Sequence, residues 1–117
     1  KLPIQYAFSY PARVQNAFKR FDFFNYPQLT FEKPDTQTFT NLALAYEALK
    51  KGGNMPCVLN AANEVAVDAF LKDKIKFLQM SELIEKCLHK IEFIQQPDYN
   101  QYIECDSETR KLAASLL

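Results

Sequence analysis

The sequence has few of the residues that build metal and nucleophile sites. Its only histidine, His89, falls within a predicted helix, so neither a metal cluster nor a Cys–His or Ser–His pair is supported. We expect His89 at the surface or at a helix seam. Cys57, Cys87 and Cys105 are widely spaced and form no Cys-x-x-Cys motif. This favours free buried thiols over a disulfide framework or a zinc site.

Net charge and long apolar runs are also absent. Fourteen basic and fourteen acidic residues give a formal net charge of zero. There is no clustered positive stripe of the kind that binds phosphates, so nucleic acid is not an expected partner. No apolar run approaches the roughly 20 residues that cross a bilayer, and no signal segment opens the chain. We therefore expect a cytoplasmic protein without a membrane partner, either processed or cut from something longer because it begins at Lys1.

Aromatic side chains are concentrated near the beginning of the chain. We predict an extended aromatic arm over residues 1–37 and a helical domain over residues 38–117. The arm has too few basic residues to bind a nucleic-acid backbone strongly, so we favour a surface that contacts protein over one that stacks nucleic-acid bases. Ten of the sixteen aromatic residues precede residue 40: Tyr6, Phe8, Tyr10, Phe18, Phe21, Phe23, Phe24, Tyr26, Phe31 and Phe39.

Helical periodicity dominates the remainder, and 48% hydrophobic residues are enough to bury a core. Apolar residues recur at helical spacing over 38–51, and Gly52 suits the turn that ends this helix. A second helix over 56–72 has the broadest apolar stripe and is expected at the centre. We predict that Ser81 caps a third helix and Asp106 a fourth. The predicted fold class is mostly α, a small antiparallel bundle of about four helices behind the arm.

Two shorter features complete the predicted fold. Pro3 opens a short helix through Tyr10, which Pro11 ends. Residues 29–31 and 75–77 alternate apolar and polar side chains, and we predict that they form a pair of short strands.

Three polar residues share one face of the second predicted helix. Asn60, Asn63 and Glu64 follow i, i+3 and i+4 spacing, and Val67 and Leu71 continue the same face with apolar groups. The trio is therefore expected to be partly buried, where each group needs a hydrogen-bond partner. It forms either a ligand site or a structural clamp on backbone groups of the arm or a neighbouring loop. We favour the clamp.

Two other motifs resemble functional sites and are better explained by structure. Asp106-Ser107-Glu108 offers two carboxylates, but consecutive positions entering a helix diverge and no third metal ligand is near, so a capping role is expected. Gly52-Gly53-Asn54 precedes a helix as phosphate loops do. It lacks the preceding strand and the Lys-Ser/Thr pair that grips phosphates.

Several motifs occur in an order that is distinctive when taken together. In that order the chain resembles the C-terminal region of the 1-deoxy-D-xylulose 5-phosphate reductoisomerase family, over essentially its whole length. The motifs are Leu2-Pro3-Ile4, Tyr10-Pro11-Ala12-Arg13-Val14, Leu29-Thr30-Phe31-Glu32, Pro34-Asp35 and Leu59-Asn60-Ala61-Ala62-Asn63-Glu64-Val65-Ala66-Val67.

The resemblance implies a role as part of an enzyme. Members rearrange and reduce 1-deoxy-D-xylulose 5-phosphate to 2-C-methyl-D-erythritol 4-phosphate in non-mevalonate isoprenoid synthesis, using NADPH and a divalent metal, Mg²⁺ or Mn²⁺. Family motifs for NADPH, metal and phosphate lie upstream of the matching region. No catalytic, cofactor or metal residue is therefore assigned here, and Asp106-Ser107-Glu108 does not inherit the family metal role.

The resemblance also implies partners. We expect a support domain, inactive alone, that packs against the upstream NADPH-binding and catalytic domains of a homodimeric enzyme. Residues 1–4 would follow the active-site segment of the family. The alternative is an independent helical interaction module that uses its aromatic arm. In either case an uncovered arm is expected to drive self-association, arm disorder or domain exchange.

Overall fold

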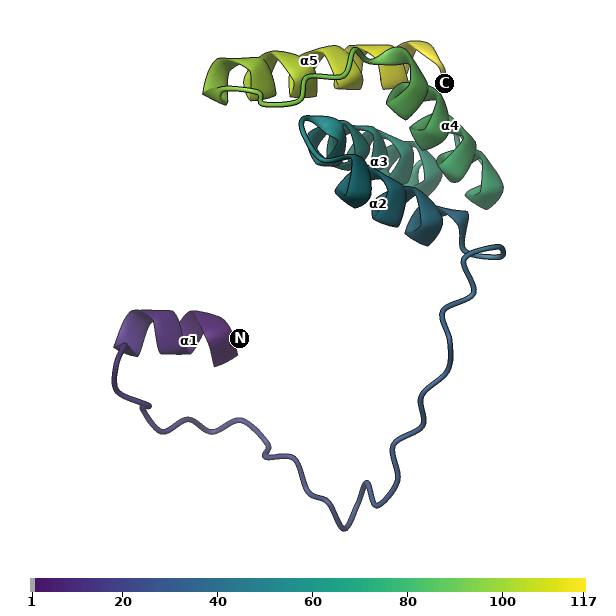
Figure 1. Cartoon of the computed structure of the whole chain (residues 1–117). Coiled ribbons are helices and arrows are strands. Elements are labelled where there is room, and N and C mark those ends of the chain that lie inside the picture. The colour runs from purple at the N-terminus through teal and green to yellow at the C-terminus, as the bar shows by residue number, and fades with distance from the viewer. Residues whose placement is uncertain (1) are drawn as a thin grey trace. The chain divides into compact units, whose positions relative to one another are not determined.

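The structure, a computed structural model, describes residues 2–117, and the regular elements within these residues are all helices (Figure 1). The predicted mostly helical class is therefore confirmed. No helix in this range is long and apolar enough to span a bilayer. The helices are α1 (Leu2–Ser9), α2 (Thr40–Lys51), α3 (Met55–Leu71), α4 (Phe77–Lys90) and α5 (Tyr99–Ser115).

The chain divides into two units, Lys1–Lys33 and Pro34–Leu117, which we call the arm unit and the bundle unit. The sequence predicted a division after residue 37, a few residues later than the division between Lys33 and Pro34. As a domain boundary it stays a prediction.

The arm unit contains one short helix and no core. α1 places Pro3 in its first turn and ends before Pro11, as predicted, and none of its side chains is buried. The chain then folds back far enough for the Gln5 side chain to donate to the Val14 carbonyl oxygen at 3.1 Å. Asn16 Nδ2 in turn donates to Gln5 Oε1 at 2.8 Å. No residue from 2 to 33 is buried, so this unit is held together by hydrogen bonds between exposed groups and by contacts between aromatic rings, such as Phe21 and Tyr26.

α3 is the central helix of the bundle unit, as its broad apolar stripe predicted. It packs against α2, α4 and α5. Four of its buried residues are alanines, and side chains this small let the neighbouring helices approach closely. The buried residues of α3 are Met55, Val58, Ala61, Ala62, Ala66 and Ala69. Partner helices contribute Leu44, Ala48, Met80, Leu83, Ile84, Cys87, Cys105 and Ala113, with Ile91 just after α4.

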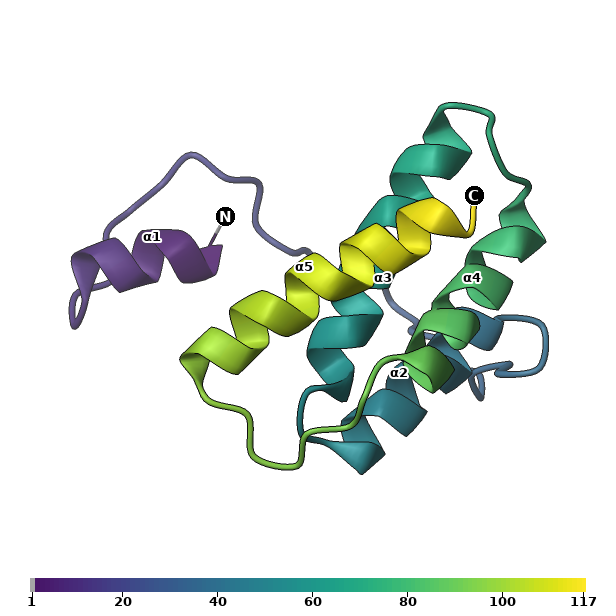
Figure 2. The ribbon, with the colours of Figure 1, turned by 90° about the horizontal axis from the view of Figure 1, so that it is seen from above.

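The last three helices run back and forth along the bundle (Figure 2). α4 returns along α3. The Phe70 ring near the end of α3 packs edge-on against the Phe77 ring at the start of α4, with the two ring centroids 6.1 Å apart, a distance usual for aromatic pairs. The connection after α4 then lies against the start of α3, where Asn54 N–H donates to the Ile94 carbonyl oxygen at 3.1 Å. α5 therefore starts beside the beginning of α3 and crosses it in the same direction.

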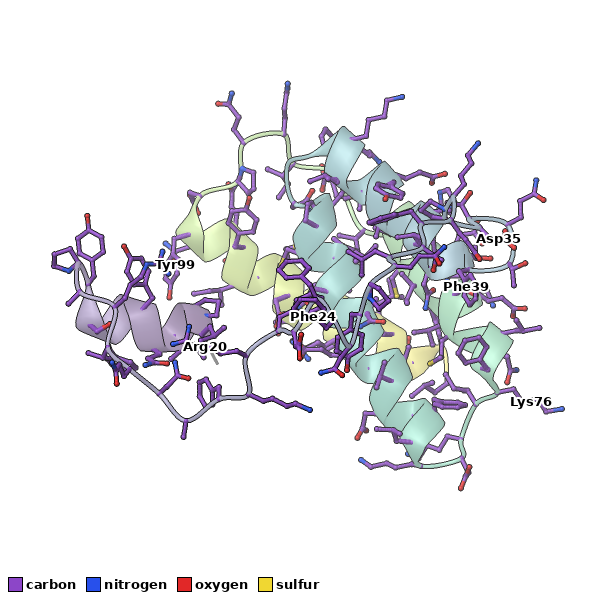
Figure 3. All side chains as sticks on the ribbon, turned by 90° about the horizontal axis from the view of Figure 1, so that it is seen from below. Arg20, Phe24, Asp35, Phe39, Lys76 and Tyr99 are labelled. Carbon is purple, nitrogen blue, oxygen red and sulfur yellow. The ribbon has the colours of Figure 1, made fainter. Side chains whose placement is uncertain are left out.

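The predicted start of the third bundle helix is wrong, and so is the predicted strand pair. α4 begins at Phe77, directly after Lys76 (Figure 3). The side chain of Gln79 accepts a hydrogen bond from Lys76 N–H at 2.7 Å, and this fixes the first turn. Residues 75–77 therefore enter a helix, and within residues 2–117 no strand is formed. Ser81 lies inside α4, where its hydroxyl donates to the Leu78 carbonyl oxygen at 2.9 Å.

The predicted start of the last helix is also wrong. Asp98 caps α5 by accepting from Gln101 N–H at 2.8 Å, and Gln101 Oε1 accepts from Asp98 N–H at 2.8 Å. This reciprocal arrangement is a capping box. The helix consequently starts at Tyr99 (Figure 3), and Asp106 lies in its middle instead of at its end.

Candidate functional site

The predicted polar trio on α3 is more exposed than its spacing suggested. Asn60 and Glu64 are exposed and Asn63 is half-buried, so the expectation of burial is wrong for two of the three. Asn60 Nδ2 donates to Glu64 Oε1 at 3.1 Å, one helical turn away. Glu64 is the member of the trio that contacts α5, and within residues 2–117 the side chain of Asn63 forms no hydrogen bond with either of the other two.

Arg110 of α5 binds the trio through Glu64. Its Nη2 donates to Glu64 Oε2 at 2.7 Å, while its Nε and Nη2 grip both oxygens of Asp106 at 2.7 and 3.1 Å. Hydrogen bonding to Arg110, supported by Asn60, holds the pKa of Glu64 below its ordinary value. The hydrogen bonds that Arg110 donates to Asp106 and to Glu64 raise the pKa of Arg110. The contact joins two side chains, whereas the sequence suggested a contact to backbone groups of the arm or a loop.

Asp106-Ser107-Glu108 does not cap a helix, because it lies in the middle of α5, and its Asp106 is not available to pair with Glu108 as a metal ligand. Asp106 is committed to Arg110 one turn later on α5. Within residues 2–117, no three His, Cys, Asp or Glu side chains gather closely enough to hold a metal ion. The prediction that this chain contributes no metal ligand stays a prediction.

Asn54 forms the buried polar clamp that sequence reasoning missed. Its side chain is 1% exposed, and its Nδ2 donates to the Glu92 carbonyl oxygen at 2.8 Å while its Oδ1 accepts from Ile94 N–H at 2.9 Å. Nδ2 also lies 3.4 Å from Cys105 Sγ. One amide therefore holds the connection between α4 and α5 against the start of α3. Its side chain forms no capping bond on α3 itself.

The two glycines before Asn54 explain the remainder of this motif. Both have positive φ, +70° at Gly52 and +56° at Gly53, where a residue with a Cβ is strained. A Cβ on Gly53 would also collide with the Ile94 carbonyl oxygen and approach the Phe93 ring to 2.8 Å. Gly52-Gly53-Asn54 is thus a tight turn that lets the α4–α5 connection approach. Its sequence signal was visible, but it resembled a phosphate loop.

The three cysteines are free, as predicted. Cys87 and Cys105 are buried and Cys57 is half-buried. Cys57 Sγ lies 3.7 Å from the Tyr102 carbonyl oxygen. Burial, with smaller contributions from Cys105 and Asp106, raises the pKa of the Cys57 thiol to about 11. A thiol so rarely ionised at neutral pH is a poor nucleophile.

His89 is a surface residue, which agrees with the prediction. Its side chain is 78% exposed and its Nε2 lies 4.0 Å from Glu85 Oε1 on the preceding turn of α4. This loose pair resembles an ordinary exposed helix pair.

The arm unit presents a large uncovered apolar surface. Phe24 is 96% exposed, Phe8 90% and Phe31 89%, and Figure 3 labels Phe24 and Arg20 on this stretch. Arg13 covers the Tyr6 ring at 4.7 Å. Arg13 and Arg20 both line a cavity of about 250 Å³ beside α1, with no carboxylate among its lining residues. Monomeric proteins rarely leave so many aromatic rings in water, so this surface is suited to contact with another protein surface.

Comparison with known proteins identifies the family of this chain. Residues 1–112 match the family model described as the DXP reductoisomerase C-terminal domain. The 1-deoxy-D-xylulose 5-phosphate reductoisomerase of Phocaeicola vulgatus is 61% identical over the whole chain, which corresponds to 31% of that protein. The same enzyme of Bacteroides thetaiotaomicron is 56% identical over the whole chain and 30% of its own length. The chain therefore spans less than a third of the curated relatives it matches.

Solved structures give the same result. The reductoisomerase from Zymomonas mobilis in complex with NADPH matches with a TM-score of 0.86 and 39% identity, over 98% of this chain and 30% of that one. A DOX-P reductoisomerase in complex with NADPH, fosmidomycin and magnesium matches with a TM-score of 0.83 and 30% identity, again over 98% and 30%. By sequence and by structure, the chain belongs to the family of DXP reductoisomerase C-terminal domains.

Proposed function

We propose that this chain is the C-terminal support domain of a reductoisomerase that converts 1-deoxy-D-xylulose 5-phosphate to 2-C-methyl-D-erythritol 4-phosphate with NADPH. The single observation that carries the proposal is the family match over residues 1–112. The named complexes with NADPH and magnesium support the cofactor assignment. The cytoplasm is the proposed location and a homodimer the proposed assembly.

The side chains of the bundle unit do not suit NADPH or a divalent metal. Asp106 and Glu64 are both paired with Arg110, and burial disfavours the thiolate of Cys57. We therefore assign both groups to the remainder of the polypeptide and derive no chemical step from this chain. Its own contribution is to brace the upstream domains, and by itself we expect it to turn over no substrate.

Different surfaces serve different parts of this role. The bundle unit buries its own core, so it can remain folded while its position is set by other contacts. The arm unit has no core, and its exposed rings are suited to pack on the upstream domains. Full burial of a phenylalanine side chain is worth about 1.5–3 kcal/mol. Several rings together therefore supply a strong attachment.

A hybrid enzyme tests the proposal. The upstream part of the Phocaeicola vulgatus reductoisomerase is joined to this chain in place of its own C-terminal domain, and substrate-dependent NADPH oxidation is measured with Mg²⁺ or Mn²⁺. We expect activity close to that of the parent, and none from the upstream part alone or from this chain alone. Inactivity of a folded, assembled hybrid contradicts the proposal, and turnover by the isolated chain contradicts the support role.

We also propose that Asn60, Asn63 and Glu64 act as a structural clamp between α3 and α5. The hydrogen bonds from Asn60 to Glu64 and from Arg110 to Glu64 support it. In the hybrid enzyme, Glu64→Ala and Asn63→Leu should lower the melting temperature and leave the KM for NADPH unchanged. Unchanged stability together with a raised KM for NADPH would indicate a ligand site instead.

A further inference from the structure

The stretch from Gln28 to Glu32, which we call the docking segment, has the pattern of a strand but no partner strand. Leu29 and Phe31 alternate with the polar residues between and around them, so in an extended chain both apolar side chains point to one side. They are 63% and 89% exposed. Within residues 2–33, the backbone N–H and C=O groups of residues 27–33 form no hydrogen bond with other backbone groups.

Prolines limit the docking segment at both ends. Pro27 precedes it and Pro34 follows Lys33. A proline has no N–H to give to a ladder and is therefore confined to strand ends and sheet edges. Five residues with one apolar and one polar face, bounded in this way, suit the edge position of a sheet and would not suit its middle.

The strand partner predicted from the sequence is occupied elsewhere. Residues 75–77 lead into α4, where Lys76 N–H is bonded to the Gln79 side chain, and residues 2–117 contain no strand. The partner must therefore lie outside these residues, either in a second copy or in the rest of a longer polypeptide. A ribbon made by two copies of the segment would have only two short strands, which is marginal in water. An existing sheet with an open edge is a better partner.

We propose that the docking segment adds as an edge strand to a β-sheet in the upstream part of the reductoisomerase polypeptide. Leu29 and Phe31 then cover apolar residues on one face of that sheet. This inference rests on the proposed function, because relatives matched by this chain over 31% of their length supply the missing part. Main-chain hydrogen bonds provide the attachment, and the two apolar side chains fix the register.

Strand addition predicts an alternating pattern of amide protection. In an edge strand, residues of one parity direct both N–H and C=O toward the neighbouring strand, and residues of the other parity direct them away. Either Leu29 and Phe31 or Gln28, Thr30 and Glu32 should be protected, but not all five. A segment merely covered by side chains shows no such alternation.

Residue-resolved amide hydrogen exchange in the hybrid enzyme tests the inference, with this chain alone as the control. Exchange at alternate positions of the docking segment should slow by at least about tenfold, which corresponds to 1.4 kcal/mol, and only in the hybrid. At a protected position, substitution by proline should abolish the protection of the other protected positions of the docking segment, whereas substitution by alanine, which keeps the N–H, should preserve it. At an unprotected position the two substitutions should behave alike.

The possible outcomes separate this inference from the proposed function. An active hybrid in which all five amides exchange freely overturns strand addition and leaves the proposed function standing. An assembled but inactive hybrid overturns the proposed function. Concentration-dependent protection in this chain alone would show that a second copy is the partner, which overturns the assignment to the upstream sheet.

Discussion

Replacing Asn54 by alanine should lower the free energy of unfolding of the bundle unit more than an asparagine-to-alanine substitution at the surface. The change removes the hydrogen bonds to the Glu92 carbonyl oxygen at 2.8 Å and from Ile94 N–H at 2.9 Å. It leaves both backbone groups without a protein partner in a partly buried connection. Each such group costs about 1–3 kcal/mol. Because water can reach part of this connection, we expect a total loss of about 2–4 kcal/mol in the free energy of unfolding.

Urea and thermal unfolding followed by circular dichroism measure this loss. For a domain of this size each kcal/mol shifts Tm by about 4–8 °C, so Tm should fall by roughly 10 °C or more. Asn100→Ala is the matched control, because Asn100 is exposed in the first turn of α5. It should change the free energy of unfolding by less than about 0.5 kcal/mol. An equally small effect of Asn54→Ala would refute the assignment of Asn54 as the clamp.

Three further predictions follow from the local geometry. Gly53→Ala should lower the free energy of unfolding by more than the roughly 1–2 kcal/mol of left-handed strain alone, and it should speed amide exchange in residues 93–95. At Gly52 a Cβ meets open space, so Gly52→Ala should leave that exchange unchanged. The pKa of Glu64 is lowered in the folded chain, so its contribution to stability is present above its ordinary pKa of 4.5 and is lost as pH falls through the folded value. Glu64→Gln should therefore reduce the fall in the free energy of unfolding at acid pH. With a pKa of about 11 against an ordinary 9.0, Cys57 should be alkylated about a hundredfold more slowly at pH ~8 in the native chain than in urea, and equal rates would contradict its burial.

The helices themselves could be predicted because their periodicity is strong. α2 and α3 begin and end within about two residues of expectation, since Gly52 and the apolar stripe of α3 are local signals. The start of α5 was also readable, because Asp98 and Gln101 have the spacing of a capping box. Asp106 was predicted as the cap instead, because it is an acidic residue that precedes the apolar end of the helix, Leu112, Ala113 and Leu116.

The start of α4, the conformation of residues 75–77 and the exposure of the polar trio could not be predicted from neighbouring residues in the sequence. α4 begins after Lys76, which is not one of the side chains that favour a cap, so Ser81 looked like the better start. The alternation in residues 75–77 was too short to distinguish a strand from the first turn of a helix. The polar trio was misjudged because the width of the buried face of α3 depends on where α5 crosses it.

The clamp at Asn54 could not be found from its surroundings in the sequence. Its partners, Glu92 and Ile94, lie about forty residues later, and their approach depends on α4 returning along α3. Gly52-Gly53-Asn54 lacks the residues that bind phosphate, but nothing next to it in the sequence indicates its structural role. A short motif of turn residues before a helix says little until the segment that packs on it is known.

NADPH oxidation by the hybrid enzyme shows whether this chain supports the reductoisomerase reaction without performing it. We expect substrate-dependent oxidation close to that of the Phocaeicola vulgatus parent when this chain is present, and none when either part is assayed alone. A folded, assembled hybrid without activity, or an isolated chain with activity, would contradict it.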